Sequence, residues 1–310
     1  MKTAGVFITR RCNLRCSYCN VQNTRDKELS LEQWCEAIDI MIELGIEKIH
    51  FLGGEPTLYE SFFEILEYIS SNTTLTCSFT TNGFFNHELL LKIINNFGKR
   101  IGVGVSIDNY DITKSISPSK AQKGIKVIEF LENKNLLQKI DLTVYIVLNK
   151  KNINEITQYI KFLSKKNISS YLLPLHWDTT TSQFVHRKNS NKNAFVSSAD
   201  LEILNFKIQE LLAEYDNLKI TNSKEFLNII PKHIRFLDRK CTQLSELRVN
   251  CDGRIMCCCD KNGKVFEKYS IFSVKENFDD FLKLREKNAL GCKGCLWPSV
   301  FESELREKVA

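Results

Sequence analysis

The sequence predicts an α/β protein: a partial (β/α)6 TIM-like barrel followed by a small Cys-rich domain at the C-terminus. Short apolar segments alternate with amphipathic segments through the first 175 residues, as parallel strands alternate with crossover helices. Polar motifs follow several of the apolar segments, at the strand ends where such barrels carry their functional groups. The alternation then stops, and seven of the twelve cysteines lie between residues 241 and 295.

Six predicted strands and the helices between them make up the barrel. The strands are expected over residues 4–9, 48–52, 75–80, 100–107, 140–148 and 168–175. The first helix is expected to begin at a capping box, Ser30 to Gln33, and to end at Gly45. Further helices are expected over residues 60–70, 87–97, 121–133 and 152–166. Six βα units are too few for a complete eightfold barrel, so a partial one is predicted.

The chain divides into three predicted parts. Residues 1–198 form the barrel core, residues 199–240 a helical linker, and residues 241–310 the Cys-rich domain. Within the linker, helices are expected over residues 199–215 and 223–238, with a break at Pro231. The polar stretch 176–197 contains Trp177, Asp178 and His186 without a clear period. A loop of this length is often functional, so substrate specificity is expected there.

Composition narrows the class of protein. The formal charge is +6, from 43 basic and 37 acidic residues without a long basic block, which favours a solvated lysine-rich surface over a nucleic-acid partner. No stretch approaches the ~20 apolar residues of a membrane span, and the N-terminal residues are typical of a first strand rather than a signal peptide. A cytoplasmic protein without a membrane partner is expected. Twelve cysteines in a reducing compartment favour metal ligation over disulfides, although Cys35 and Cys77 are expected to be buried small apolar residues.

Cys12, Cys16 and Cys19 place three thiolates within eight residues, directly after the first predicted strand. Three thiolates can hold three irons of a [4Fe–4S] cube, whose usual ligand set is four cysteines, so one iron would stay open for another ligand. A zinc site would favour pairs of cysteines and four protein ligands. The motif therefore predicts an iron–sulfur cluster with an open coordination site.

The CxxxCxxC spacing, with Tyr18 before the last cysteine, resembles that of the radical S-adenosylmethionine (SAM) superfamily. The resemblance covers about the first half of the chain. It implies that the open iron binds the amino and carboxylate groups of SAM, and that an electron from a reductant such as flavodoxin or ferredoxin cleaves SAM to methionine and a 5′-deoxyadenosyl radical. That radical then abstracts a hydrogen atom from the substrate.

Further motifs at strand ends extend the resemblance. Gly53, Gly54, Glu55 and Pro56 resemble the GGEP segment that binds the SAM amino group in that family. Glycines allow close backbone approach, and a carboxylate suits an ammonium group. The resemblance also implies cofactor contacts from polar or aromatic residues near other strand ends. These residues are Tyr18, Asn82, Ser106, Asp108 and Asn149.

The C-terminal cysteines resemble those of the auxiliary-cluster modules called SPASM or twitch domains. A β-hairpin is expected around Asp252-Gly253, followed by a distant CxxC pair. One auxiliary [4Fe–4S] cluster of the twitch type is implied, because too few cysteines follow Cys259 for two clusters. Its implied ligands are Cys241, Cys258, Cys292 and Cys295, with Cys257 at the position usual for proline. A zinc ribbon with the same ligands is the alternative, and which of residues 257–259 binds metal stays open.

Three functions fit these residues. Cys259 directly follows the aligned ligand, as the hydrogen donor does in relatives that epimerise peptide residues. The first hypothesis is therefore a radical SAM epimerase acting on a peptide residue or sugar carbon with Cys259 as donor, although Cys259 could equally be a buried spare thiol. The second is a dehydrogenase or peptide-crosslinking (RiPP maturase) enzyme whose auxiliary cluster transfers electrons. The third is a zinc-stabilised nucleic-acid-binding or tRNA-modifying protein. A small molecule or peptide is the expected substrate, bound without a recognition module ahead of the barrel.

Overall fold

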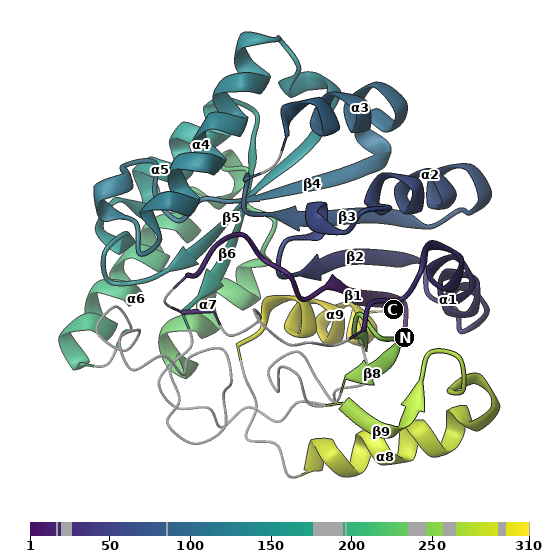
Figure 1. Cartoon of the computed structure of the whole chain (residues 1–310). Coiled ribbons are helices and arrows are strands. Elements are labelled where there is room, and N and C mark those ends of the chain that lie inside the picture. Colours follow the sequence, from purple (N-terminus) through teal and green to yellow (C-terminus); the bar gives the residue numbers. More distant parts are fainter. Residues whose placement is uncertain are drawn as a thin grey trace.

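The computed structural model describes residues 1–16, 18–19, 27–84, 86–175, 195, 197–234, 246–256, 265–290 and 296–309. These residues build one curved sheet with helices around it (Figure 1). The sheet has nine strands in the order β6-β5-β4-β3-β2-β1-β7-β8-β9. None of the helices in this part of the chain is both long and apolar enough to cross a membrane.

The first six strands are parallel neighbours and confirm the predicted partial (β/α)6 barrel. They are β1 (Thr3–Thr9), β2 (Lys48–Gly53), β3 (Thr76–Thr81), β4 (Ile101–Ser106), β5 (Asp141–Leu148) and β6 (Ser169–Pro174). The helices between successive strands are α1 (Leu31–Glu43), α2 (Phe62–Asn72), α3 (His87–Phe97), α4 (Pro118–Asn133) and α5 (Ile156–Lys165). These helices lie on the outer face of the sheet (Figure 1).

The two faces of the sheet differ because apolar and polar residues alternate along the strands. Buried side chains such as Phe51 and Phe79 point outward and meet Phe62 of α2 edge-on, at ring distances of 5.8 and 5.1 Å. The intervening positions of β2, β3, β5 and β6 are only partly buried. Parallel strands covered by apolar side chains on both faces would read as continuous apolar runs, so this alternation indicates a concave face that is not filled by the core.

Local signals placed most element ends correctly. The capping box at α1 is present, with Ser30 and Gln33 each bonding the backbone of the other. Helix α4 begins three residues earlier than expected, because Pro118 takes the first helical position that suits its fixed φ. The predicted break at Pro231 is wrong: α7 (Lys224–His233) continues through it. Without an N–H, Pro231 cannot donate to the Leu227 carbonyl, so α7 loses one hydrogen bond and ends two residues later at His233. Helix α6 (Ser198–Ala213) precedes α7.

The C-terminal segment joins the barrel sheet. Strand β7 (Glu246–Val249) pairs in parallel with β1, and β8 (Arg254–Met256) turns back against β7. The predicted hairpin is thus confirmed, with Gly253 at φ +80° in its turn. Strand β9 (Val265–Ser270) and helix α8 (Phe278–Leu290) follow, and α9 (Pro298–Val309) returns to the concave side of the sheet (Figure 1). The predicted boundary of a separate domain at residue 241 stays a prediction.

Candidate active site

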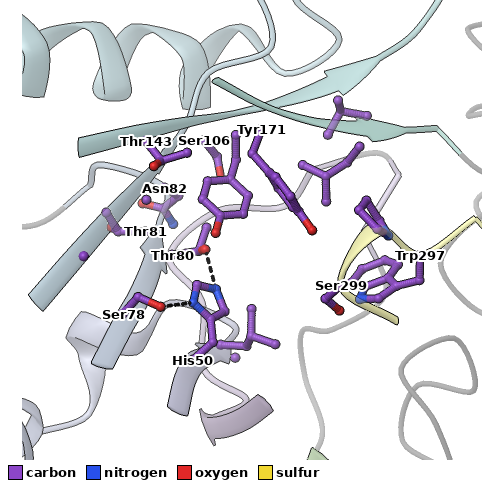
Figure 2. Close-up of a pocket in the computed structure, with 18 of the residues that line it drawn as sticks. His50, Ser78, Thr80, Thr81, Asn82, Ser106, Thr143, Tyr171, Trp297 and Ser299 are labelled. Atoms are coloured by element: carbon purple, nitrogen blue, oxygen red, sulfur yellow. Dashed lines mark hydrogen bonds between the residues drawn. The ribbon is translucent and has the colours of Figure 1, made fainter. Parts of the chain in front are cut away.

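The concave side of the barrel encloses a cavity of about 540 Å³. Cys12, Cys16 and Cys19 border one end of it, at the carboxyl ends of the strands. The side chains that point into its middle come from β2, β3, β4, β5 and β6, and residues next to and within α9 close another side (Figure 2). The structure therefore brings the predicted cysteine motif to the mouth of a deep pocket.

The three cysteines are partly exposed. A turn joins two of them, with the Cys19 N–H donating to the Cys16 carbonyl at 3.1 Å. The Cys12 sulfur accepts from the Leu14 N–H at 3.4 Å and from the Asn82 amide at 3.7 Å. Burial raises the pKa of the Cys12 thiol to about 11.

The donor set fits an iron–sulfur cluster rather than a single ion. Among the described residues, no group of three His, Cys, Asp or Glu side chains is arranged to hold one metal ion. Cysteines that each bind a different iron of a cube need not converge on one point. Three cysteines in a short loop at a cavity mouth would therefore suit a [4Fe–4S] cluster that leaves one iron for another ligand.

Gly53 and Gly54 let the loop after β2 lie directly on the backbone that leads into Cys12. A Cβ on Gly54 would stand 2.0 Å from the Arg11 carbonyl oxygen, and one on Gly53, at φ +151°, 2.3 Å from the Thr9 carbonyl oxygen. The Gly54 N–H donates to the Thr9 carbonyl at 2.9 Å. Both glycines border the cavity, and their predicted contact with SAM stays a prediction.

Glu55 occupies the wall behind the cavity. Its buried carboxylate accepts hydrogen bonds from the Thr57 hydroxyl, the Thr81 hydroxyl and the Asn82 N–H, each at 2.7 Å. It thereby joins the ends of β2 and β3, and burial raises its pKa. Neither Glu55 nor Pro56 is among the described residues that line the cavity, and their predicted contact with SAM stays a prediction.

Of the other residues predicted to contact the cofactor, some line the cavity and some do not. Tyr18, Asn82 and Ser106 line the cavity. Asp108 and Asn149 are fully buried, outside the described lining, and bond nearby backbone. Their predicted contacts with SAM also stay predictions.

Tyr18 has a charged partner from the outer helices. Lys120, on the first turn of α4, is 6% exposed and donates a hydrogen bond to the Tyr18 hydroxyl. Burial raises the pKa of Tyr18, and the nearby charges of Cys16 and Asp108 add to the effect. The lysine also borders the cavity, and nothing in the sequence pattern had singled it out.

Six of the seven cysteines in the second, C-terminal set lie outside the described residues, as do Trp177, Asp178 and His186. These six are Cys241, Cys257, Cys258, Cys259, Cys292 and Cys295. The seventh, Cys251, is fully buried. The chain can be followed to Met256, which is buried against Phe7, with Cys19 packed on the same small cluster. Of the cysteines outside both sets, Cys77 is buried as expected, whereas Cys35 is only partly buried.

A polar and aromatic ledge inside the barrel was not predicted. His50 bonds the Ser78 hydroxyl through Nδ1 at 2.7 Å and the Thr80 hydroxyl through Nε2 at 2.9 Å (Figure 2). The Tyr145 ring stacks on His50 at 6.0 Å, and its hydroxyl also bonds Thr80. The ring centre of Tyr171 lies 5.0 Å from that of Tyr145. Burial, with Arg248 and Lys48 nearby, lowers the pKa of His50 to about 3, so its imidazole is neutral at physiological pH.

The sequence does contain a signal for this ledge. Polar and aromatic residues stand at every second position of the strands, as in the run Thr143, Tyr145 of β5 and the run Ser78, Thr80 of β3. Gly104 of β4 belongs to the same face, and a Cβ there would stand 2.4 Å from the Tyr145 ring. This glycine lets the tyrosine reach across β4 toward Thr80.

Comparisons with known proteins agree with the geometry. A sequence profile of the radical SAM superfamily matches residues 6–163. A probable GTP 3',8-cyclase of Sulfolobus acidocaldarius is 24% identical over 269 residues, which cover 84% of this chain and 82% of that protein. The structure of Streptococcus suis SuiB bound to S-adenosylmethionine has a TM-score of 0.67 at 17% identity, covering 94% of this chain and 72% of that one. Native anSMEcpe with bound AdoMet has a TM-score of 0.63 at 16% identity, covering 97% and 88%.

The matched profile spans the part of the chain that carries the three cysteines, the glycine loop and the ledge-bearing strands β2 to β5. The structures of SuiB and anSMEcpe share the fold of this chain. The chain therefore belongs to the radical SAM superfamily.

Proposed function

We propose that the protein cleaves SAM reductively at a [4Fe–4S] cluster held by Cys12, Cys16 and Cys19 and removes a hydrogen atom from a substrate in the barrel. The observation that carries this proposal is the continuity of the cavity, because the cysteines and the polar ledge border the same space of about 540 Å³. A cofactor and a substrate bound there would lie side by side, as hydrogen-atom transfer requires.

Membership of the superfamily implies a [4Fe–4S] cluster and SAM, which when bound supply a carbon radical able to take a hydrogen atom. The protein's own residues bind and orient the cofactor and the substrate. The backbone of Gly53 and Gly54 is open to the cavity, and the Asn82 amide donates to the Cys12 sulfur. The bound SAM or AdoMet of SuiB and anSMEcpe supports this use of the shared fold.

The lining of the barrel favours a polar substrate without a large net charge. Its charged side chains balance: three are basic and three acidic among the described lining residues, namely Lys48, Lys120, Arg248, Asp141, Glu246 and Glu302. Arg248 is already ion-paired to Glu246 at 2.7 Å. Neutral His50 and the neighbouring hydroxyl and aromatic groups offer hydrogen bonds and flat apolar faces. A sugar ring or a peptide segment fits this chemistry.

GTP cyclisation is a second candidate, because the matched Sulfolobus protein is named a probable GTP 3',8-cyclase. A triphosphate carries several negative charges and calls for a surplus of basic groups. The described lining has no such surplus. We therefore rank GTP below a neutral polar substrate for this chain.

Within this chemistry we propose epimerisation of a peptide residue or sugar carbon, with Cys259 returning a hydrogen atom to the opposite face. Dehydrogenation or peptide crosslinking through an auxiliary cluster is the alternative. Both use the second cysteine set, so only the sequence supports this part. A reductant such as flavodoxin or ferredoxin would deliver the electron, in the cytoplasm.

Anaerobically purified protein with dithionite and SAM should release 5′-deoxyadenosine, detected by chromatography and mass spectrometry. A Cys12/Cys16/Cys19→Ala variant should release none. Wild type that holds about four irons at the first site but yields no 5′-deoxyadenosine would refute the proposal. Adding GTP tests the ranking of the two substrate classes. Rapid consumption of GTP would show that the substrate is a nucleotide rather than a neutral polar molecule.

The epimerase hypothesis has its own readout, once a peptide or sugar substrate is found. In deuterated water an epimerase product gains solvent deuterium at the inverted carbon, whereas an oxidised product does not. Cys259→Ala should stop inversion but not 5′-deoxyadenosine formation. Unchanged inversion in that variant would exclude Cys259 as the donor.

A further inference from the structure

Ser117 stands at the N-cap of α4 but does not cap the helix. A serine at this position normally accepts a backbone N–H of the first turn. Here the side chain makes no such bond. Its hydroxyl instead lies 3.2 Å from the Cys16 sulfur, with the residue 9% exposed.

Most other serines at helix N-caps do cap their helices. Ser30, Ser197 and Ser223 stand at the N-caps of α1, α6 and α7, and each accepts a backbone N–H of its own helix, whereas Ser61 at the N-cap of α2 makes no such bond. Ser117 has the same chemistry and the same position relative to its helix. Its hydroxyl is therefore directed to the sulfur at the expense of a capping bond that the chain uses elsewhere.

A buried carboxylate fixes the segment that carries Ser117. Asp108 accepts from the Ser115 hydroxyl at 2.6 Å and from the Ile116 N–H at 2.7 Å. The Ser115 hydroxyl in turn accepts the Ser117 N–H at 2.9 Å. This chain of bonds holds Ser117 beside Cys16, and it gives Asp108 a structural use in the wall of the site.

The same turn of α4 supplies a second contact with the cysteine motif. Lys120 is three residues after Ser117, so both side chains leave the same face of the helix. Lys120 bonds the Tyr18 hydroxyl, while Ser117 meets Cys16. The first turn of α4 thus contacts two residues of the motif with a hydroxyl and a buried positive charge.

We propose that Ser117 is a positioning residue that donates a hydrogen bond to the Cys16 sulfur and thereby raises the reduction potential of the cluster. The proposal rests on the proposed function, since it needs the cluster at Cys12, Cys16 and Cys19. Reduction moves one electron from the external reductant to the cluster and its thiolates, without breaking a bond or moving a proton. A hydrogen bond to a sulfur stabilises the more negative, reduced form, and such bonds help to set the potentials of these clusters.

The test is a redox titration of the loaded protein, followed by electron paramagnetic resonance of the reduced cluster, without any substrate. Ser117→Ala should shift the reduction equilibrium about tenfold toward the oxidised form, which for one electron is a midpoint about 59 mV lower. Ser117→Thr keeps a hydroxyl and should restore most of the shift. Ser223→Ala removes a capping serine remote from the motif and should leave the midpoint unchanged.

A second variant keeps the test decisive if Ser117→Ala loses its iron. Ser115→Ala frees the segment without touching Cys16 and should lower the midpoint in the same direction by less. Midpoints of Ser117→Ala and Ser115→Ala equal to wild type, with about four irons retained at this site, would overturn the inference and leave the proposed function standing. Wild type without iron would refute the proposed function itself.

Discussion

Replacing His50 by glutamine should remove a component of acid destabilisation from this protein. The imidazole is held between two hydroxyls, those of Ser78 and Thr80, and burial beside Arg248 and Lys48 lowers its pKa to about 3. The unfolded chain binds a proton at this residue below a pKa of about 6.5, whereas the folded protein does not. His50 therefore contributes stability that is complete above pH 6.5 and is lost as the pH falls from there toward 3.

The magnitude follows from the two pKa values. Well below pH 6.5 the free energy of unfolding falls by about 1.36 kcal/mol for each pH unit. Between pH 7.5 and pH 5.5 the loss from His50 amounts to about 1.4 kcal/mol. This free-energy loss is an upper limit because the ring borders the cavity, where water screens its charge. Glu55, with its raised pKa, acts in the opposite direction but equally in both proteins.

Urea unfolding of wild type and His50→Gln at pH 7.5, 6.5 and 5.5 measures the effect. Glutamine can donate and accept between the same hydroxyls but does not titrate. The difference in unfolding free energy between the two proteins should shrink or reverse toward pH 5.5. Parallel curves over this range would show that His50 takes up a proton as readily in the folded protein as in the unfolded chain, and the lowered pKa of His50 would be wrong.

Three further changes have definite expected outcomes. Gly54→Ala sets a Cβ 2.0 Å from the Arg11 carbonyl oxygen and should abolish iron loading, measured as iron per chain; a fully loaded variant would contradict the close approach. Gly104→Ala pushes a methyl into the Tyr145 ring at 2.4 Å and should lower the unfolding free energy by about 1–3 kcal/mol, and no loss would mean the ring lies elsewhere. Ser223→Ala removes a capping bond of 3.0 Å and a hydrogen bond of 3.1 Å to Glu302, and should cost at least about 1 kcal/mol by urea unfolding. Ser117→Ala, which removes no cap, should cost less than Ser197→Ala, which removes the cap of α6, and equal losses would argue that Ser117 does cap α4.

Much of the site could be predicted because its motifs follow successive parallel strands along the chain. The carboxyl ends of parallel strands meet at one edge, so motifs that follow successive strands must come together. Cys12, Gly54 and Asn82 follow three different strands, Ser106 ends a fourth, and all four border one cavity. Asp108 is two residues beyond the end of β4 and points away, because the direction of a side chain past a strand depends on the turn that follows.

The local pattern of apolar and polar residues was enough for the six-stranded barrel, the capping box of α1 and the hairpin at Asp252-Gly253. Each of these depends on residues close together in the chain. Pairing of β7 with β1, the reach of Tyr145 across Gly104 to Thr80, and the turn of Ser117 toward Cys16 were decided only in the folded molecule. They depend on strand register and on contacts between distant segments, and the period of a single segment carries no information about its partner.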